Sequence, residues 1–305
     1  MPSTITHAYI GLDSLKKINK KPNDIINRHL NNYKIYCQNM DVLYFYQILF
    51  LKGNKIQEIG HTFHREKIYK SFELLINDNK KNKDEELFTF ISGLITHYVA
   101  DSTMHPYIDY LSHNQDETKR VDKHFEIETY IDNYFINKYQ TNNYKKFNNG
   151  KFIFNYTEEE IIKEEINKLF KVIYNINKVG TRYYQALDEM AFVFKYIRHD
   201  RYGIKKKLFQ IIDLNPFHIR KTKYLSYHFN LDNNEYYLNL NHNTWYNYFD
   251  KEKISNESFL ELYEKVTNKA SNMINEVYEY IFEDKSKDLK KIIGNISYST
   301  GLSLD

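Results

Sequence analysis

Cysteine is nearly absent from this chain of 305 residues, in which Cys37 is the only one. A single cysteine excludes an intramolecular disulfide and any zinc site built from several thiolates. A metal site in this chain must therefore use histidine, aspartate and glutamate side chains.

Glycine and proline are also scarce, with 9 and 4 residues. Sandwiches and barrels of many short strands need frequent turns, which these two residues commonly supply. Aromatic residues are abundant instead, and 42% of all residues are hydrophobic, which argues against a disordered chain. We therefore expect an all-α fold, with residues 1–305 forming a single multi-helix globular domain.

No strong excess of charge is present, because 43 basic and 40 acidic residues leave a net charge of +3. This balance lacks the basic footprint of a dedicated nucleic-acid-binding protein. No apolar run approaches the 18 residues of a membrane span, and the first residues lack the pattern of a signal peptide. The sequence therefore predicts a cytoplasmic protein without stable membrane insertion, and it leaves the oligomeric state open.

Along most of the chain, apolar residues recur at the spacing of an α-helix. In the first half it predicts a short helix over 6–20 ended by Pro22, a buried core helix over 40–51, and an amphipathic helix over 61–76. The polar run 77–86 is expected to be an exposed loop. The apolar segment 87–105 is expected to be a helix that ends at Pro106.

The second half of the chain shows the same spacing in longer, more polar segments. Helices are expected near the following ranges: 123–139, 158–176, 181–198, 202–213 and 257–282. We therefore expect supporting helices over 156–290.

Three potential metal ligands lie in the most apolar helix. His97, Asp101 and His105 are spaced four residues apart, so successive side chains are displaced by only about 40° around an α-helix. An aspartate in an apolar helix carries a heavy desolvation cost unless it is paired or metal-bound. The spacing therefore favours a metal site over three separate hydrogen-bonded core residues.

A second pair, His124 and Glu128, repeats this spacing on the next predicted helix. The two segments together offer five nitrogen and oxygen donors. Zinc accepts neutral imidazole and carboxylate ligands, and a catalytic zinc site keeps one position open for water. These five residues are therefore the first candidates for zinc ligands.

For the remaining candidates the pattern alone favours ordinary packing or surface roles. His61 and His64 are three residues apart, whereas His7 and Asp41 are isolated in the sequence. The chain has no Gly-rich phosphate loop, no GxSxG motif and no HExxH motif, so nucleophilic serine and P-loop chemistries are disfavoured.

Five motifs follow one another along the chain: THAYIGLDSL from Thr6, QNMD from Gln38, GHTFHRE from Gly60, HYVADSTMHPYIDY from His97 and HFEIE from His124. In this order they resemble the bacterial zinc-dependent phospholipase C family, which includes phosphatidylcholine-preferring phospholipases C and clostridial alpha-toxin-like enzymes. The resemblance covers about residues 3 to 135. The toxins' membrane-docking β-sandwich has no counterpart after Glu158.

The resemblance implies a fold of the zinc-dependent phospholipase C/nuclease type, with the metal-site helices in residues 1–135. It implies two or three zinc ions, a bridging Asp101, and catalytic roles for Asp41 and Asp101. Between His61 and His64 it favours His61. The implied metal ligands are His7, Asp41, His61 or His64, His97, Asp101, His105, His124 and Glu128.

The same resemblance implies a function: zinc-dependent hydrolysis of a phosphate ester, either a phospholipid headgroup or a small phosphodiester. One alternative is a hydrolase like the single-strand nucleases, which share this type of site but are secreted and usually disulfide-bonded. The other alternative is a binding protein that keeps the metal for stability without turnover.

Overall fold

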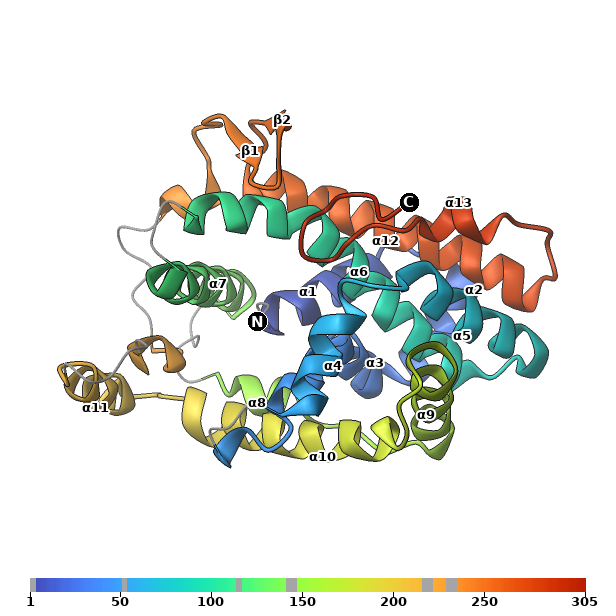
Figure 1. Ribbon diagram of the computed structural model, residues 1–305, viewed down its shortest axis with the longest axis horizontal. Coiled ribbons are helices and arrows are strands. Elements are labelled where there is room, and N and C mark those ends of the chain that lie inside the picture. The colour runs from blue at the N-terminus through green and yellow to red at the C-terminus, as the bar shows by residue number, and fades with distance from the viewer. Residues whose placement is uncertain (1–3, 51–53, 114–116, 141–146, 216–221, 229–234) are drawn as a thin grey trace.

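A long helix, α6 (Glu85–Ser112), forms the centre of the molecule (Figure 1). Every residue from Glu86 to Ser102 is buried, so this helix is covered on all sides. The computed structural model describes residues 4–50, 54–113, 117–140, 147–215, 222–228 and 235–305. Within these ranges the only sheet is a two-stranded hairpin, which confirms the all-α prediction.

The helices that pack directly on α6 include α1 (Thr4–Leu15), α3 (Leu30–Tyr36), α5 (Ile68–Asn82), α7 (Glu117–Tyr139) and α12 (Phe259–Phe282). The approach of α3 depends on Gly93, because a Cβ there would lie 2.4 Å from the Cβ of Tyr36. Helices from both ends of the chain thus share one apolar centre.

The remaining elements surround this centre. The helices are α2 (Lys20–Arg28), α4 (Lys55–Phe63), α8 (Asn149–Ile153), α9 (Glu160–Tyr174), α10 (Val179–Phe192), α11 (Ile204–Ile212) and α13 (Leu289–Ile293). Short 3₁₀ segments are η1 (Asn39–Phe45), η2 (Ile48–Phe50), η5 (Thr222–Leu225) and η6 (Glu235–Leu238), and η4 (Val193–Arg198) is π-helical. Strands β1 (Trp245–Asn247) and β2 (Asp250–Ser255) pair antiparallel, with Trp245 opposite Ser255.

The helices predicted in the second half are confirmed as α7, α9, α10 with η4, α11 and α12. Among the described residues, no helix combines the length and the apolar composition that crossing a membrane requires.

Three helix predictions in the first half are wrong. Helix α1 ends at Leu15 rather than near residue 20, and Pro22 does not end a helix but lies in the first turn of α2, where a proline is tolerated.

The other two predicted helices are interrupted by changes in backbone direction. The segment 40–51 contains the 3₁₀ turns η1 and η2, because the backbone at Asn39 and again at Gln47 takes a positive φ that an α-helix does not allow. The segment 61–76 is divided between α4 and α5, since Lys67 also takes a positive φ. Each break changes the direction of the chain close to a candidate ligand.

The polar run 77–86 is not a loop throughout. Helix α5 continues to Asn82, and the Asp84 side chain then accepts a hydrogen bond from the Leu87 N–H to cap α6. Pro106 does not end α6 either. A proline removes only one helical hydrogen bond, and the turns beyond it are anchored by buried Tyr107, whose hydroxyl donates to the Tyr237 carbonyl.

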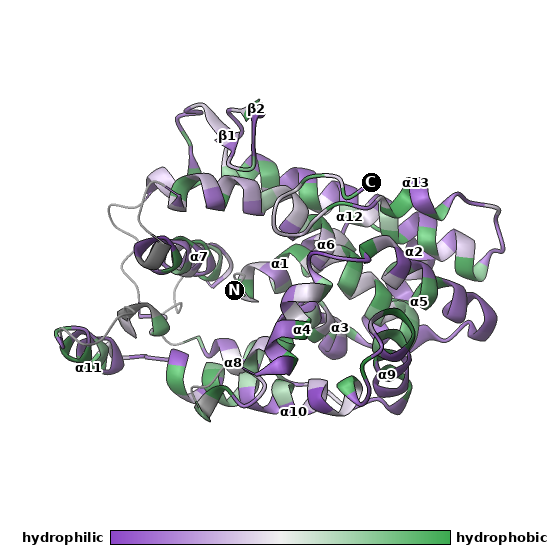
Figure 2. Ribbon diagram, viewed as in Figure 1, coloured by the Kyte–Doolittle hydropathy of each residue, from purple (hydrophilic) through white to green (hydrophobic). Residues whose placement is uncertain are grey.

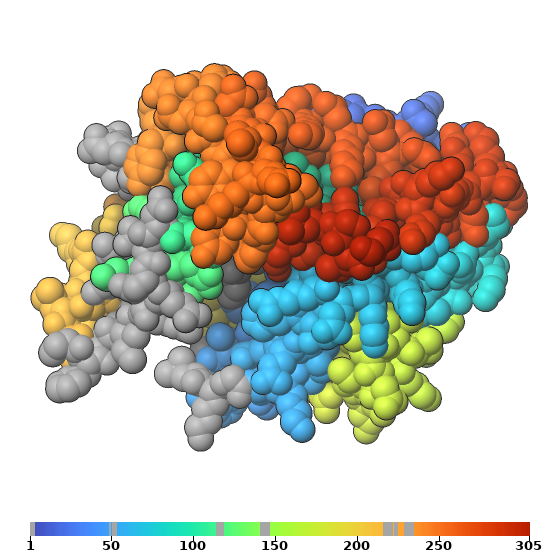
Figure 3. All heavy atoms as spheres, turned by 45° about the horizontal axis from the view of Figure 1, so that its top comes forward, coloured from blue at the N-terminus to red at the C-terminus, as the bar shows by residue number. Residues whose placement is uncertain are grey.

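After α13 the chain turns back over the middle of the molecule. We call residues 294–305 the C-terminal strap. Figure 3 shows the C-terminal residues in red between the hairpin in orange and α4 in light blue. The Asn247 amide donates to the Thr300 carbonyl, and the Tyr298 N–H donates to the His64 carbonyl, so the strap is bonded to both neighbours.

Candidate metal centre

Helix α1 carries His7 into the interior, where the residue is 4% exposed. The start of this helix is held by Asp132 of α7, whose carboxylate accepts the Thr6 N–H at 2.8 Å and the Ile5 N–H at 3.3 Å. A carboxylate at this position satisfies N–H groups that a helix leaves free and complements the helix dipole. The position of His7 therefore depends on α7.

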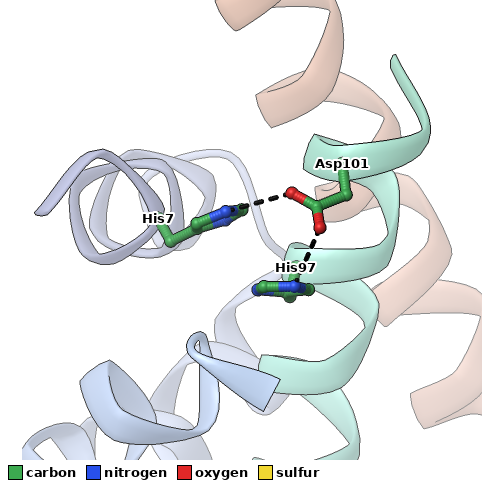
Figure 4. A group of neighbouring side chains, drawn as sticks. All are labelled: His7, His97 and Asp101. Carbon is green, nitrogen blue, oxygen red and sulfur yellow. Dashed lines mark ion pairs between the residues drawn. The ribbon is translucent and has the colours of Figure 1, made fainter. Parts of the chain in front are cut away.

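The two oxygens of Asp101 lie between two histidines (Figure 4). Oδ1 is 3.1 Å from His7 Nε2, and Oδ2 is 3.1 Å from His97 Nε2. The two rings are stacked with their centroids 4.2 Å apart. One buried carboxylate thus joins a histidine of α1 to a histidine of α6.

A second group lies on the other side of His97. Asp41 projects from η1, and His64 follows the end of α4. His64 Nε2 is 3.2 Å from Asp41 Oδ1, and His97 Nε2 is 3.8 Å from Asp41 Oδ2. His97 therefore belongs to both groups.

The third group joins α6 to α7. His124 Nε2 is 2.9 Å from Glu128 Oε1, and His105 Nε2 is 3.9 Å from the same oxygen. His105 is also near the first group, with Nδ1 3.7 Å from Asp101 Oδ2. In each of the three groups the potential ligand atoms lie within 4.8 Å of one another. The four-residue spacings seen in the sequence place these side chains on facing surfaces of the two helices.

Burial and neighbouring charges separate the two buried aspartates. Burial raises the pKa of Asp41 above its ordinary value. Burial also opposes ionisation of Asp101, but His105, His97 and His7 together hold its pKa well below the usual range. Asp101 is therefore the ionised carboxylate of the centre, whereas Asp41 needs an added positive charge to ionise as readily.

Two histidines at the centre are oriented by backbone carbonyls. The ring Nδ1–H of His97 donates to the Cys37 carbonyl at 2.9 Å, and that of His64 donates to the Gly60 carbonyl at 2.6 Å. Burial lowers the pKa of His64 to about 3. The second nitrogen of the His64 ring, Nε2, therefore presents a lone pair to Asp41, and His97 Nε2 faces both carboxylates.

This arrangement fits a bound cation. Lone pairs and carboxylate oxygens repel one another unless positive charge lies between them. Four buried atoms at the centre have no hydrogen-bond partner among the described residues: His7 Nδ1, Asp41 Oδ2, His64 Nε2 and His97 Nε2. Unpaired buried polar atoms are costly, and imidazole with carboxylate is a ligand set that zinc accepts.

A small cavity of about 10 Å³ opens beside the centre. It lies between α1, α6, α7 and the start of α12. The potential ligands His7, Asp101, His105 and Glu128 line it together with the mainly apolar set Thr6, Ile10, Met104, Ile108 and Phe259.

The structure brings eight of the nine candidate residues together and leaves His61 apart. His61 is exposed, with its ring 4.5 Å from that of Tyr44. Helix α4 ends at Phe63, so the chain turns directly after it and carries His64 inward toward Asp41. Of the two histidines that the sequence left open, the geometry favours His64, against the preference for His61.

Two residues at the centre were not foreseen. Asp109 Oδ1 is 3.5 Å from His124 Nδ1 and fixes the orientation of that ring. The Tyr298 carbonyl accepts a hydrogen bond from His105 Nδ1–H at 3.0 Å, and the Tyr298 ring lies 4.7 Å from the ring of His64. Asp109 follows His105 by four residues, which was a usable signal, whereas no sequence pattern connects Tyr298 with His105.

Burial lowers the pKa of His124, but the neighbouring carboxylates of Glu128 and Asp109 outweigh this effect and raise the pKa to about 9. Both carboxylates are themselves ionised more readily because of this histidine. Without a metal, the third group is therefore an ion pair around a protonated imidazole.

A family model described as zinc dependent phospholipase C matches residues 1–177. The match spans more than half of the chain and includes all of the candidate ligands. No curated protein and no solved structure gives a match.

Proposed function

Because the chain belongs to the zinc-dependent phospholipase C family, we propose that it is a zinc-dependent phosphodiester hydrolase with phospholipase C-like chemistry. The observation that carries this proposal is the shared geometry of the three His/carboxylate groups. His97 takes part in two of them, and Asp101 lies within 3.7 Å of histidine nitrogens from three positions on α1 and α6. Shared ligands of this kind are typical of neighbouring ions that act together on one substrate. They are less typical of a single, isolated structural ion.

We assign the ligands from the three groups. His64, Asp41 and His97 would hold one ion, and His7 and Asp101 would hold a second with Asp101 as the bridge. His105, His124 and Glu128 would complete the centre. Two or three zinc ions are compatible with these groups, and His61 has no role in this assignment.

When bound, zinc would supply positive charge to the phosphate and make a nearby water more acidic. The chain's own residues do the remaining work. Asp41 Oδ2 makes no hydrogen bond with any described residue, so we assign it to orient water and accept its proton. Water then attacks phosphorus, and the phosphorus–oxygen bond to the leaving alkoxide breaks.

The apolar residues beside the centre keep bulk water away from the ligands. Ile10, Met104, Ile108 and Phe259 line the cavity next to Asp101 and Glu128, which has room for about one water molecule. A low-polarity wall strengthens the electrostatic interactions within the site. The two substrate classes, a phospholipid headgroup and a small soluble phosphodiester, therefore rest on the family and not on this cavity.

The direct test is metal analysis combined with hydrolysis by the purified full chain. We expect two or three zinc ions per chain and turnover of soluble chromogenic phosphodiesters that chelators abolish and zinc restores. Asp101→Asn should lower kcat/KM at least about a hundredfold, since even residues that only orient zinc ligands contribute 10- to 100-fold.

The matched control is His61→Gln, which removes the neighbouring exposed histidine and should leave both zinc content and turnover unchanged. Zinc at full stoichiometry with no turnover of any phosphodiester would favour the non-catalytic alternative. Release of nucleotides from single-stranded DNA, with no turnover of phospholipid, would favour the nuclease alternative.

A further inference from the structure

Helix α11 has no buried residue. Its packing within the described part of the chain is against η5, and in Figure 1 it lies at one end of the molecule, away from the α6 centre. Ile204 is 68% exposed, Leu208 is 54% exposed and Ile211 is 65% exposed. While these side chains remain in water, the helix lacks the stabilisation that burial of an apolar face ordinarily provides.

The three residues form one stripe. At about 100° per residue they lie within about 60° of one another around the helix axis. Figure 2 shows strongly hydrophobic and strongly hydrophilic positions side by side on α11. Tyr202 and Leu214, which flank the helix in the sequence, are 71% and 80% exposed. We call these five residues the α11 patch.

This concentration is not a general property of the surface. Of the 17 large hydrophobic residues that are exposed in the described ranges, eight lie between 192 and 214. Single exposed apolar residues need no explanation, whereas a contiguous patch marks a surface that binds something.

The charges around the α11 patch are basic. Lys205 and Lys207 fall on either side of the stripe, and Arg201 and Lys207 are exposed. Residues 195–215 hold six basic and two acidic side chains. Neither acid is exposed: Asp200 is buried, and half-buried Asp213 accepts a hydrogen bond from the Thr222 hydroxyl.

Hydrogen bonds and the contact with η5 hold α11 in place: the Lys206 N–H donates to Asp200 Oδ2, and the Thr222 hydroxyl donates to the Phe209 carbonyl. The Lys205 ammonium donates to the His199 carbonyl at 2.7 Å and to the Tyr196 carbonyl. These carbonyls belong to the end of the π-helical segment η4. The helix is thereby held while its apolar stripe stays outward.

We propose that the α11 patch is a docking surface for an anionic lipid bilayer, with the apolar stripe at the level of the headgroups and the basic side chains on the phosphates. A basic amphipathic helix with an exposed apolar face binds membranes in this way, through buried apolar area together with attraction to anionic lipids. The docking proposal rests on the proposed function in one respect: a phospholipid substrate would lie in the bilayer. A second copy of this chain is the other conceivable occupant, but an identical basic surface would oppose it.

The experiment is flotation of the purified full chain with vesicles of phosphatidylcholine alone or mixed with phosphatidylglycerol. We expect the protein to float with the mixed vesicles, to float poorly with phosphatidylcholine alone, and to be partly released by salt. Ile204→Ser/Leu208→Ser/Ile211→Ser should lower the bound-to-free ratio at least about tenfold. Arg201→Glu/Lys207→Glu should remove the preference for phosphatidylglycerol.

The matched control replaces three exposed apolar residues elsewhere, Val172→Ser/Leu240→Ser/Ile254→Ser, and should float as the unchanged protein does. Equal flotation of this control and the α11 triple variant would overturn the proposal, as would an absence of flotation of the unchanged protein. A dimer in light scattering that the α11 substitutions abolish would assign the patch to self-association instead. Flotation requires no turnover, so it can succeed or fail independently of the hydrolysis test.

Discussion

His97 is the residue on which the centre depends most. Its Nδ1–H is committed to the Cys37 carbonyl, and its Nε2 faces two carboxylates from different elements. A backbone carbonyl partner fixes which nitrogen carries the proton and holds the ring in one orientation. His97 is also fully buried, so its position follows that of α6 itself.

Zinc binding should release protons at neutral pH. In the metal-free protein the pKa of His124 is raised to about 9, so this ring is protonated at pH 7. Zinc binds the neutral imidazole. The affinity for zinc should therefore increase with pH up to about pH 9. Above that pH it should no longer depend on the protonation of His124. Calorimetry in buffers of different ionisation enthalpy should show release of about one proton or more per chain.

Asp109→Asn supplies the comparison for this prediction. It removes a carboxylate that raises the pKa of His124, so fewer protons should be released at pH 8 than from the unchanged protein. An observed heat that is the same in all buffers would contradict the assignment of His124 as a zinc ligand.

The sequence could predict those site residues whose spacing along one helix already places them on the same face. His97, Asp101 and His105 share one helix face, as do His124 and Glu128, and the structure brings them together. Asp41 lies in the 3₁₀ segment η1 and His64 directly after the end of α4, where the α-helical periodicity of the sequence does not predict the direction of a side chain. For these two, only the resemblance to a family pointed toward the centre, and it did not choose His64 over His61.

Among the elements, the C-terminal strap reaches the metal centre from farthest along the chain. Its Tyr298 carbonyl holds His105, and the Ile296 N–H donates to the Tyr98 hydroxyl of α6. The strap packs closely at Gly301, where a Cβ would lie 2.6 Å from the Ser102 carbonyl oxygen and 2.8 Å from Pro106 Cγ. The strap thus fits against α6 at its proline.

Two glycine substitutions test this contact. Gly301 and Gly294 both take a positive φ, of +64° and +71°, but a Cβ at Gly294 would meet no atom closer than 3.8 Å. Gly294→Ala should lower the free energy of unfolding by about 1–3 kcal/mol through backbone strain alone. Gly301→Ala should lower it by about 1–3 kcal/mol more because of the added contact.

Denaturant titration measures the stability difference, and competition with a chelator measures zinc affinity. Only Gly301→Ala should weaken zinc binding, by about tenfold or more, because the Tyr298 carbonyl moves away from His105. Equal effects of the two substitutions on both measurements would show that the strap plays no part in the centre.

The predicted helices after residue 120 were confirmed because apolar spacing there is uninterrupted. The errors at 40–51 and 61–76 arose where non-glycine residues take a positive φ, as Asn39 and Lys67 do. Tertiary contacts impose such conformations. A single sequence carries little sign of them, and the strap's contacts likewise join residues almost 200 positions apart.

At the scale of the whole molecule, helix α12 joins the two ends of the chain. It packs along α6 and on α1, where the Ser271 hydroxyl donates to the Ser14 carbonyl and the Tyr263 hydroxyl donates to Asp13. These contacts support the proposal that residues 1–305 form one domain.

One domain should unfold in one transition. Trp245 is the only tryptophan, and its ring lies 5.3 Å from that of Tyr107 on α6, so its fluorescence reports on the contact between the hairpin and the central helix. Upon heating, Trp245 fluorescence, far-ultraviolet circular dichroism and zinc release should share one midpoint. Separate midpoints would divide the chain into independently stable parts.

The strap also has a consequence for biosynthesis. His105 leaves the ribosome 193 residues before Tyr298, whose carbonyl fixes its ring. During that interval the nascent chain presents the histidines of α6 without this constraint, and α12 has not yet covered the central helix. Zinc acquired at this stage would bind a flexible set of ligands, so we expect accurate metal loading only after the whole chain has been synthesised.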